Sequence, residues 1–274
     1  MQIYVNHITS YRFSQPQSRL IQLLRVTPIS YAGHNVLEWS IDVDCDARLR
    51  TSADGFGNIV TMLYLDGSVS ALRITNRGTV LTENRAGLIS GIIETLPPVA
   101  YTRTSPLTGK DDAICALATL IQSRHTSQVD MLHALMKAIR DKMRFEIGEP
   151  SIDRTAATAF AQGHGVCQDF AHIFCVAARS IGIPARYVSG HLVIREGIAP
   201  QNASHAWVEA YVSDLGWVGF DVTNGVCPDD GYVRVAIGLD YQGAAPLSGM
   251  RVGGGAEEMD VHVQVTQSGQ QSQN

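Results

Sequence analysis

The sequence predicts an α+β protein with two domains, and three features support this fold class. Over residues 1–95, apolar and polar residues alternate in short segments separated by turn residues, as they do in antiparallel strands. Past a proline-containing segment at 96–110, apolar residues recur three and four positions apart, as in amphipathic helices. Strand-like patterns return after residue 184, so helices precede strands in this half instead of alternating with them, which favours α+β over α/β.

Residues 1–95 are expected to form a small antiparallel β-sandwich. Its strands are predicted at 3–11, 22–26, 36–44, 59–65 and 68–80, and turn signals lie at 53–55, 66–67 and 76–78. The cluster Asp54-Gly55-Phe56-Gly57-Asn58 is interpreted as a turn, because Asp, Gly and Asn are residues that tight turns require.

Residues 96–266 are expected to form the second domain, which begins with a polar, proline-containing linker at 96–110. Its helices are predicted at 111–122, 127–145, 155–162 and 167–181, and its strands at 185–194, 204–213, 216–222, 233–238 and 259–265, with a turn at 201–203. Residues 267–274 contain only Gln, Ser, Gly and Asn, so a disordered tail is expected there.

Composition narrows the class of protein. The formal net charge is −5 and no dense Lys/Arg run occurs, so nucleic acid and anionic membrane surfaces are poor partners. Apolar runs fall short of the roughly 18 residues that a membrane span needs. Residues 1–7 lack the basic head and apolar segment of a secretory signal, so a cytoplasmic location is expected. The chain has five cysteines and no CxxC pair, which favours reduced thiols. Composition does not predict an oligomeric state.

A candidate nucleophile lies in the patch at 163–172, GHGVCQDFAH. Gly163 and Gly165 allow a tight turn into the helix predicted to start near Cys167. Unpaired N–H groups and the positive end of the helix dipole favour a thiolate at such a position, and the same N–H groups can donate to an oxyanion. The other helical cysteines, Cys115 and Cys175, are interpreted as inert core thiols.

A base and a carboxylate follow on neighbouring predicted strands. His205 starts the strand at 204–213, and Asp221 ends the strand at 216–222. A tight turn joins the two strands, so a hairpin would bring both side chains to one edge of the sheet. A helix N-terminus packed over that edge would complete a Cys–His–Asp triad, in which the base takes the thiol proton and the carboxylate orients the imidazole.

At these residues the chain resembles the transglutaminase-like cysteine-enzyme superfamily, and in particular its bacterial branch of two-domain proteins that are often called cysteine proteases. The resemblance lies in the patches GVCQDFAH, GIPARYVSGHL, SHAWVEAY and GWVGFDVTNG, and in YVNHITSY and DGFGN of the N-terminal half. It implies a papain-like core with Cys167 as nucleophile, His205 as base and Asp221 as acid. It implies no cofactor, and a peptide or protein amide as substrate.

Two positions depart from the pattern of the family. Val222 stands where the family often has Pro, and His191 where it often has Tyr. Neither is a member of the predicted triad, but His191 can alter the cleft. We therefore expect substrate contacts from Gln168, which follows the nucleophile, from Trp207 and from His191.

Alternative functions remain open at this point. The family resemblance does not separate hydrolysis of a thioester by water from its transfer to an amine, although bacterial members favour hydrolysis. A non-catalytic binding module on the same fold, or a structural role in an assembly, is also compatible with the pattern. Zinc binding by Cys167, His205 and His172 or His164 is disfavoured, because no paired CxxC or HxxxH spacing is present.

Overall fold

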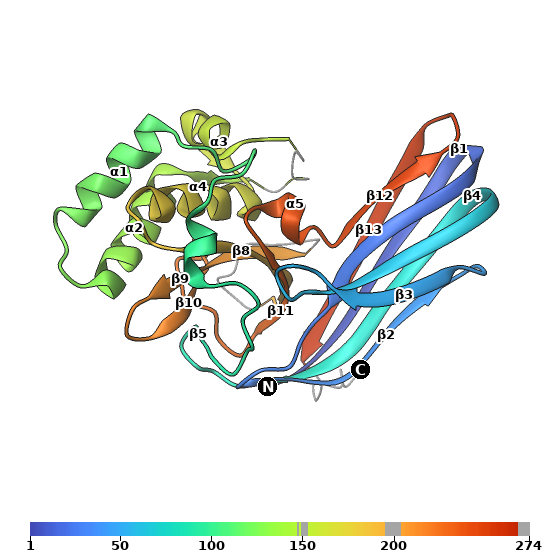
Figure 1. Ribbon diagram of the computed structural model, residues 1–274, viewed down its shortest axis with the longest axis horizontal. Coiled ribbons are helices and arrows are strands. Elements are labelled where there is room, and N and C mark those ends of the chain that lie inside the picture. The colour runs from blue at the N-terminus through green and yellow to red at the C-terminus, as the bar shows by residue number, and fades with distance from the viewer. Residues whose placement is uncertain (147, 149–152, 195–203, 268–274) are drawn as a thin grey trace, which may run out of the picture.

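The computed structural model describes residues 1–146, 148, 153–194 and 204–267 (Figure 1). Long strands lie on one side of the molecule, and a helical layer packed on a second sheet lies on the other (Figure 1). Within the described residues the strands form a six-stranded, a five-stranded and a two-stranded sheet, and the first two are antiparallel throughout. This arrangement confirms the predicted α+β fold class.

Two long strands run through the whole N-terminal sheet and bend it on itself. β1 (Gln2–Thr27) pairs with β4 (Ile59–Thr82), with register shifts between Arg12 and Gln17. One half of the sheet is completed by β2 (His34–Val43) and β13 (Glu257–Gln267), and the other by β3 (Arg48–Ala53) and β12 (Leu247–Val252). Apolar side chains of both halves pack around one cluster, which includes Tyr11, Leu20, Leu63 and Ile74.

The alternating patterns predicted several short strands where the structure has two long ones. The segments predicted at 3–11 and 22–26 are parts of β1, and the turn signals at 66–67 and 76–78 lie inside β4. β3 was not predicted, because its six residues are all exposed and carry no buried periodicity. A turn does occur at 54–58, between β3 and β4.

The C-terminal strands belong to the N-terminal sheet. β12 and β13 both pair antiparallel with β1, β12 with its second half and β13 with its first. The sequence assigned the strand at 259–265 to a second domain ending at residue 266, and this assignment is corrected by the pairing. The alternating pattern of the strand was recognised, but local alternation carries no information about the partner strand. Residues 268–274, the expected tail, lie outside the described residues.

The helices surround α4, which is the central element of the second unit. Their bounds are η1 (Pro98–Thr102), α1 (Asp112–Gln122), α2 (Gln128–Lys142), α3 (Ala156–Gln162), α4 (Cys167–Ser180) and α5 (Tyr241–Ala244). The side chains of Asp111, Ser127 and Thr155 cap α1, α2 and α3 by accepting backbone N–H bonds. Every residue of α4 from Gln168 to Arg179 is buried, so the start of this helix is fixed by packing on its neighbours.

The second sheet has the strand order β11-β8-β9-β10-β5. Its strands are β5 (Leu88–Ile89), β8 (Ala185–Leu192), β9 (His205–Val212), β10 (Gly216–Phe220) and β11 (Tyr232–Gly238); the short β6 (Arg144–Phe145) and β7 (His164–Gly165) pair separately. One face of β9, including Ala206 and Val208, belongs to the core formed with α4, whereas Trp207 belongs to a separate cluster on the other face. The turn expected at 201–203 lies outside the described residues.

Hydrogen bonds join the N-terminal sheet to both ends of β11. Near its start, the Thr82 hydroxyl at the end of β4 donates to the carbonyl of Asp230 at 2.5 Å. Near its end, the side-chain amide of Asn58 donates to the carbonyl of Ile237 and accepts from its N–H, both at 2.8 Å. The cluster at 54–58 therefore forms a turn and also contacts the second sheet, because the side chain of its last residue, Asn58, bonds to the backbone of the edge strand β11.

Candidate active site

Cys167 is the first residue of α4, as the sequence predicted. α3 ends at Gly163, whose φ of 72° is a left-handed conformation that suits glycine. The Asp169 carboxylate then reaches back over the turn and accepts the N–H of Val166 at 2.9 Å. A Cβ atom at Gly165 would overlap this carboxylate, so the second glycine is needed for close approach and not for its φ angle.

Arg154 holds the same turn from outside. Its guanidinium donates to the carbonyl of His164 at 2.7 Å and to the side-chain oxygen of Gln162 at 2.5 Å. It also lies 3.4 Å from the Asp169 carboxylate. The pKa of Asp169 is raised by burial, although the Val166 N–H and Arg154 act in the opposite direction. The turn before Cys167 is therefore fixed by one charged pair and several backbone contacts.

His205 and Asp221 form a buried pair at the edge of the second sheet. The Nε2 atom of His205 lies 2.6 Å from Oδ2 of Asp221, and the two residues are 1% and 0% exposed. His205 begins β9, and Asp221 follows β10 directly, so the β9–β10 hairpin brings them together as the sequence pattern indicated.

Asp221 receives further hydrogen bonds that the sequence did not predict. The Asn224 amide donates to Oδ2 at 2.6 Å, the Asn224 N–H donates to Oδ1 at 3.1 Å, and the Tyr232 hydroxyl donates to Oδ2 at 2.8 Å. Asn224 lies in the patch GWVGFDVTNG, three residues after the carboxylate, and Asx-turn chemistry could have identified it. Tyr232 lies on another strand, β11, and no residue pattern around it indicates a contact with Asp221.

Burial and charge act against each other on this pair. Burial alone would lower the pKa of His205, but the Asp221 charge and hydrogen bond outweigh it and raise the pKa of His205 to about 10. Burial would likewise raise the pKa of Asp221, but His205, Asn224 and Tyr232 hold it below its ordinary value. The pairing therefore favours the charged form of both groups over what burial alone would give.

Cys167 is partly exposed. The Nδ1 atom of His205 is buried and makes no hydrogen bond of regular geometry within the described residues. The thiol of Cys167 is nevertheless close enough to raise the pKa of the His205 ring. Catalytic hydrogen bonds are often long or poorly aligned before substrate binds, so the arrangement is compatible with a nucleophile and its base.

The three residues expected to contact substrate lie at different distances from this centre. Gln168 is adjacent to Cys167 and is buried in α4. Trp207 is buried too, and its ring lies 6.1 Å from that of His205. His191 packs edge-on against His7 of β1, with ring centroids 5.6 Å apart, so it is found at the contact between the two sheets. Its substrate role stays a prediction.

The histidines considered as metal ligands have other contacts. His164 Nδ1 lies 2.8 Å from a Glu146 oxygen. His172 is fully buried, and its Nε2 accepts the N–H of Tyr241 at 3.0 Å. Over residues 1–146, 148, 153–194 and 204–267, no group of three His, Cys, Asp or Glu side chains is arranged to hold a metal ion.

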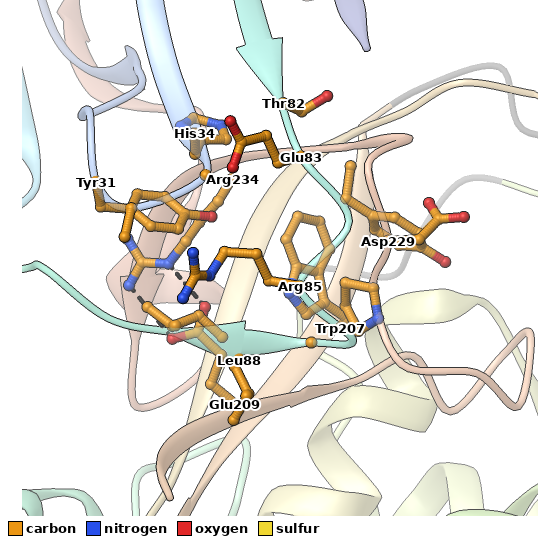
Figure 2. A pocket seen from close by; sticks show the side chains of 16 residues that line it. Tyr31, His34, Thr82, Glu83, Arg85, Leu88, Trp207, Glu209, Asp229 and Arg234 are labelled. Carbon is orange, nitrogen blue, oxygen red and sulfur yellow. Dashed lines mark hydrogen bonds and ion pairs between the residues drawn. The ribbon is translucent and has the colours of Figure 1, made fainter.

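A small crevice lies on the other face of the second sheet (Figure 2). Its volume is about 40 Å³, enough for a few water molecules but not for a peptide. Tyr31 and His34 of the N-terminal sheet line it together with Trp207 and Tyr232. Cys167 does not border it, so the crevice is distinct from the predicted nucleophile, although Trp207 and Tyr232 connect it to His205.

The chain belongs to the transglutaminase-like superfamily. Residues 116–222 match the model of that superfamily, and this range includes Cys167, His205 and Asp221. Residues 3–81 match the bacterial transglutaminase-like N-terminal region. The resemblance inferred from the sequence patches is thereby confirmed for both halves of the chain.

Relatives of known sequence or structure agree with this membership. An uncharacterized protein of Mycobacterium leprae is 31% identical over 280 residues, which cover 96% of this chain and 97% of the relative. A protein-glutamine gamma-glutamyltransferase of Pseudomonas aeruginosa is 27% identical over 160 residues, which cover 51% of this chain but 23% of that enzyme. A crystal structure named as a putative cysteine protease from Cytophaga hutchinsonii has the same fold, with a TM-score of 0.78, 20% identity and coverage of 97% of this chain and 90% of the other.

None of the helices in the described residues has the length and apolar character that crossing a membrane requires.

Proposed function

We propose that the chain is a cysteine-dependent acyl-transfer enzyme, with Cys167 as nucleophile, His205 as base and Asp221 as the orienting acid. The observation that carries this proposal is the buried His205–Asp221 pair, 2.6 Å apart, together with Cys167 at the first position of α4, whose thiol acts to raise the pKa of His205. Membership in the transglutaminase-like superfamily supports it, since the matched range contains all three residues.

The proposed reaction starts with attack of the Cys167 thiolate on the carbonyl carbon of a peptide or carboxamide. Backbone N–H groups at the start of α4 stabilise the oxyanion of the tetrahedral intermediate. The His205 imidazolium gives its proton to the leaving amine, the C–N bond breaks, and a thioester to Cys167 remains. Asp221 stabilises the charged imidazole and fixes its orientation throughout.

Water then completes the reaction in the version that we favour. His205 removes a proton from the water, hydroxide adds to the thioester, and a carboxylic acid leaves as Cys167 is regenerated. An amine in place of water would give transglutamination through the same thioester. Hydrolysis is favoured by the likeness to a structure named as a putative cysteine protease, and transfer by the partial match to a protein-glutamine gamma-glutamyltransferase.

Alkylation tests the nucleophile without knowledge of the substrate. We expect iodoacetamide to modify Cys167 rapidly at about pH 6, where ordinary thiols barely react. His205→Ala should abolish this selectivity, whereas Cys115→Ser, which removes a partly exposed thiol of α1, should not. Equal alkylation rates for Cys167 and Cys115 would support the non-catalytic binding module instead.

A substrate screen then separates the two reactions. Peptides and glutamine amides are incubated with the wild-type chain and with Cys167→Ala, each with and without an added primary amine. A new carboxylate that does not depend on the amine indicates hydrolysis. Ammonia released together with incorporated amine indicates transfer, and equal product with Cys167→Ala contradicts both.

A further inference from the structure

Tyr232 contacts both members of the buried pair from a strand that supplies no triad residue. It begins β11 and is 6% exposed, and its hydroxyl donates to Oδ2 of Asp221 at 2.8 Å. The same oxygen lies 2.6 Å from Nε2 of His205 and 2.6 Å from the Asn224 amide. Three donors converge on one carboxylate oxygen, so the carboxylate has a single favourable orientation.

The ring of Tyr232 adds a packing constraint to this hydrogen bond. Its centroid lies 5.4 Å from the Trp207 ring, nearly perpendicular to it, and 6.1 Å from the His205 ring. Trp207 stands two residues after His205 on the same face of β9. Tyr232 therefore restrains Asp221 through its hydroxyl and His205 through its ring.

The N-terminal sheet holds the strand that carries Tyr232. Thr82 bonds the carbonyl of Asp230, two residues before Tyr232, and Asn58 bonds both backbone groups of Ile237, five residues after it. Tyr232 also borders the crevice, which Thr82 and Tyr31 line as well. The position of Tyr232 thus depends on these contacts from the N-terminal half as well as on the pairing of β11 with β8.

We propose that Tyr232 is a positioning residue for the Asp221–His205 pair and that the N-terminal domain fixes Tyr232 through Thr82. This inference rests on the proposed function, since it gives a role in that chemistry to a residue outside the triad. In this proposal the N-terminal domain contributes to the site by keeping the Asp221 carboxylate aligned with His205.

The test is a double-mutant cycle on the reactivity of Cys167 in the full chain. Iodoacetamide is the probe, and the alkylation rate of Cys167 is followed by peptide mass analysis. Tyr232→Phe should slow alkylation about tenfold, as expected on losing a hydrogen bond to a charged group. In an Asp221→Ala background the same substitution should have no further effect, because its target is gone. Thr82→Val should slow alkylation about twofold to threefold. In a Tyr232→Phe background the same substitution should leave the alkylation rate unchanged.

Controls separate positioning from damage to the fold. Tyr211→Phe makes the same chemical change on β9, at the far end from His205, and should leave the rate unchanged. Multiplicative effects of Tyr232→Phe and Asp221→Ala would overturn the positioning role, because a merely structural residue acts independently. If His205→Ala fails to slow alkylation, the proposed function itself is wrong. If His205→Ala slows it and Tyr232→Phe does not, only the positioning role is wrong.

Discussion

Asn58 and Ile237 are paired like neighbours in a β-sheet, although one is a side chain in the turn between β3 and β4 and the other is backbone of β11. The two hydrogen bonds are both 2.8 Å long, and Asn58 is 3% exposed. The Asp54 carboxylate orients Asn58 by accepting its N–H and its side-chain amide, each at 3.0 Å. The contact therefore fixes the two units relative to each other at one defined point.

Asn58→Ala is expected to lower the free energy of unfolding by about 2–4 kcal/mol, because it leaves a buried N–H and a buried carbonyl of Ile237 without partners. Urea denaturation measures this loss. Asn84→Ala is the matched control: Asn84 is exposed and accepts the N–H of Ala86, so its loss should stay below about 1 kcal/mol. Equal effects of the two variants would contradict the importance of the Asn58 contact.

Gly165→Ala is expected to displace the start of α4, because the new Cβ would occupy the place of the Asp169 carboxylate. The Val166 N–H then loses its cap, and Cys167 moves relative to His205. A displacement of about 1 Å can cost roughly 100-fold in rate, so alkylation of Cys167 should fall by up to that factor. Gly109→Ala, at a glycine with open space around it, should leave the rate unchanged. A normal rate in Gly165→Ala would show that the turn tolerates the added methyl group.

Asp221→Asn should change how stability depends on pH. The pKa of His205 is raised from 6.5 to about 10 in the folded chain, so the stabilisation from its charge is complete below pH 6.5 and is lost as pH rises toward 10. In Asp221→Asn, burial acts without the opposing charge, and the pKa of His205 should fall below 6.5. NMR titration of the imidazole measures this directly. An unchanged His205 pKa would mean that Asp221 is not its dominant partner.

Acidification should weaken the contact between the two sheets. Burial lowers the pKa of His7 to about 4, and burial together with His7 lowers the pKa of His191 to about 3. The unfolded chain therefore binds protons below pH 6.5 that the folded chain does not, so the free energy of unfolding decreases as pH falls from 6.5 toward 4. His191→Leu replaces the titratable imidazole by an apolar side chain of similar volume and should make this decrease shallower. An identical slope in His191→Leu would exclude His191 as a contributor.

Local sequence patterns were sufficient to predict the helix and the hairpin that carry the residues of the predicted triad. The apolar spacing after Cys167 defined α4, and its packing bears out that helix. Alternation from His205 and the glycine turn before β10 defined the hairpin that joins His205 to Asp221. These features depend on periodicity within about ten residues, which is the range that a single sequence reports well.

Long-range pairing could not be predicted in the same way. Nothing within β13 says that its partner is β1, some 250 residues earlier, rather than the nearer β11. The contact of Tyr232 with Asp221 depends on the register of β11 against β8, which contains an irregularity between Arg234 and Ala236. Such an irregularity shifts which side chains reach the site, and the local pattern does not specify it.

The return of β12 and β13 to β1 has a consequence for synthesis on the ribosome. β1 is translated well before its partners β12 and β13, so the first sheet stays incomplete until those two strands have been made. The helical unit is in effect an insertion between strands of another domain. A shortened gene that stops after residue 95 would encode an open sheet edge along β1, prone to aggregate. Separate expression of that domain requires excising the insertion and rejoining the flanking segments.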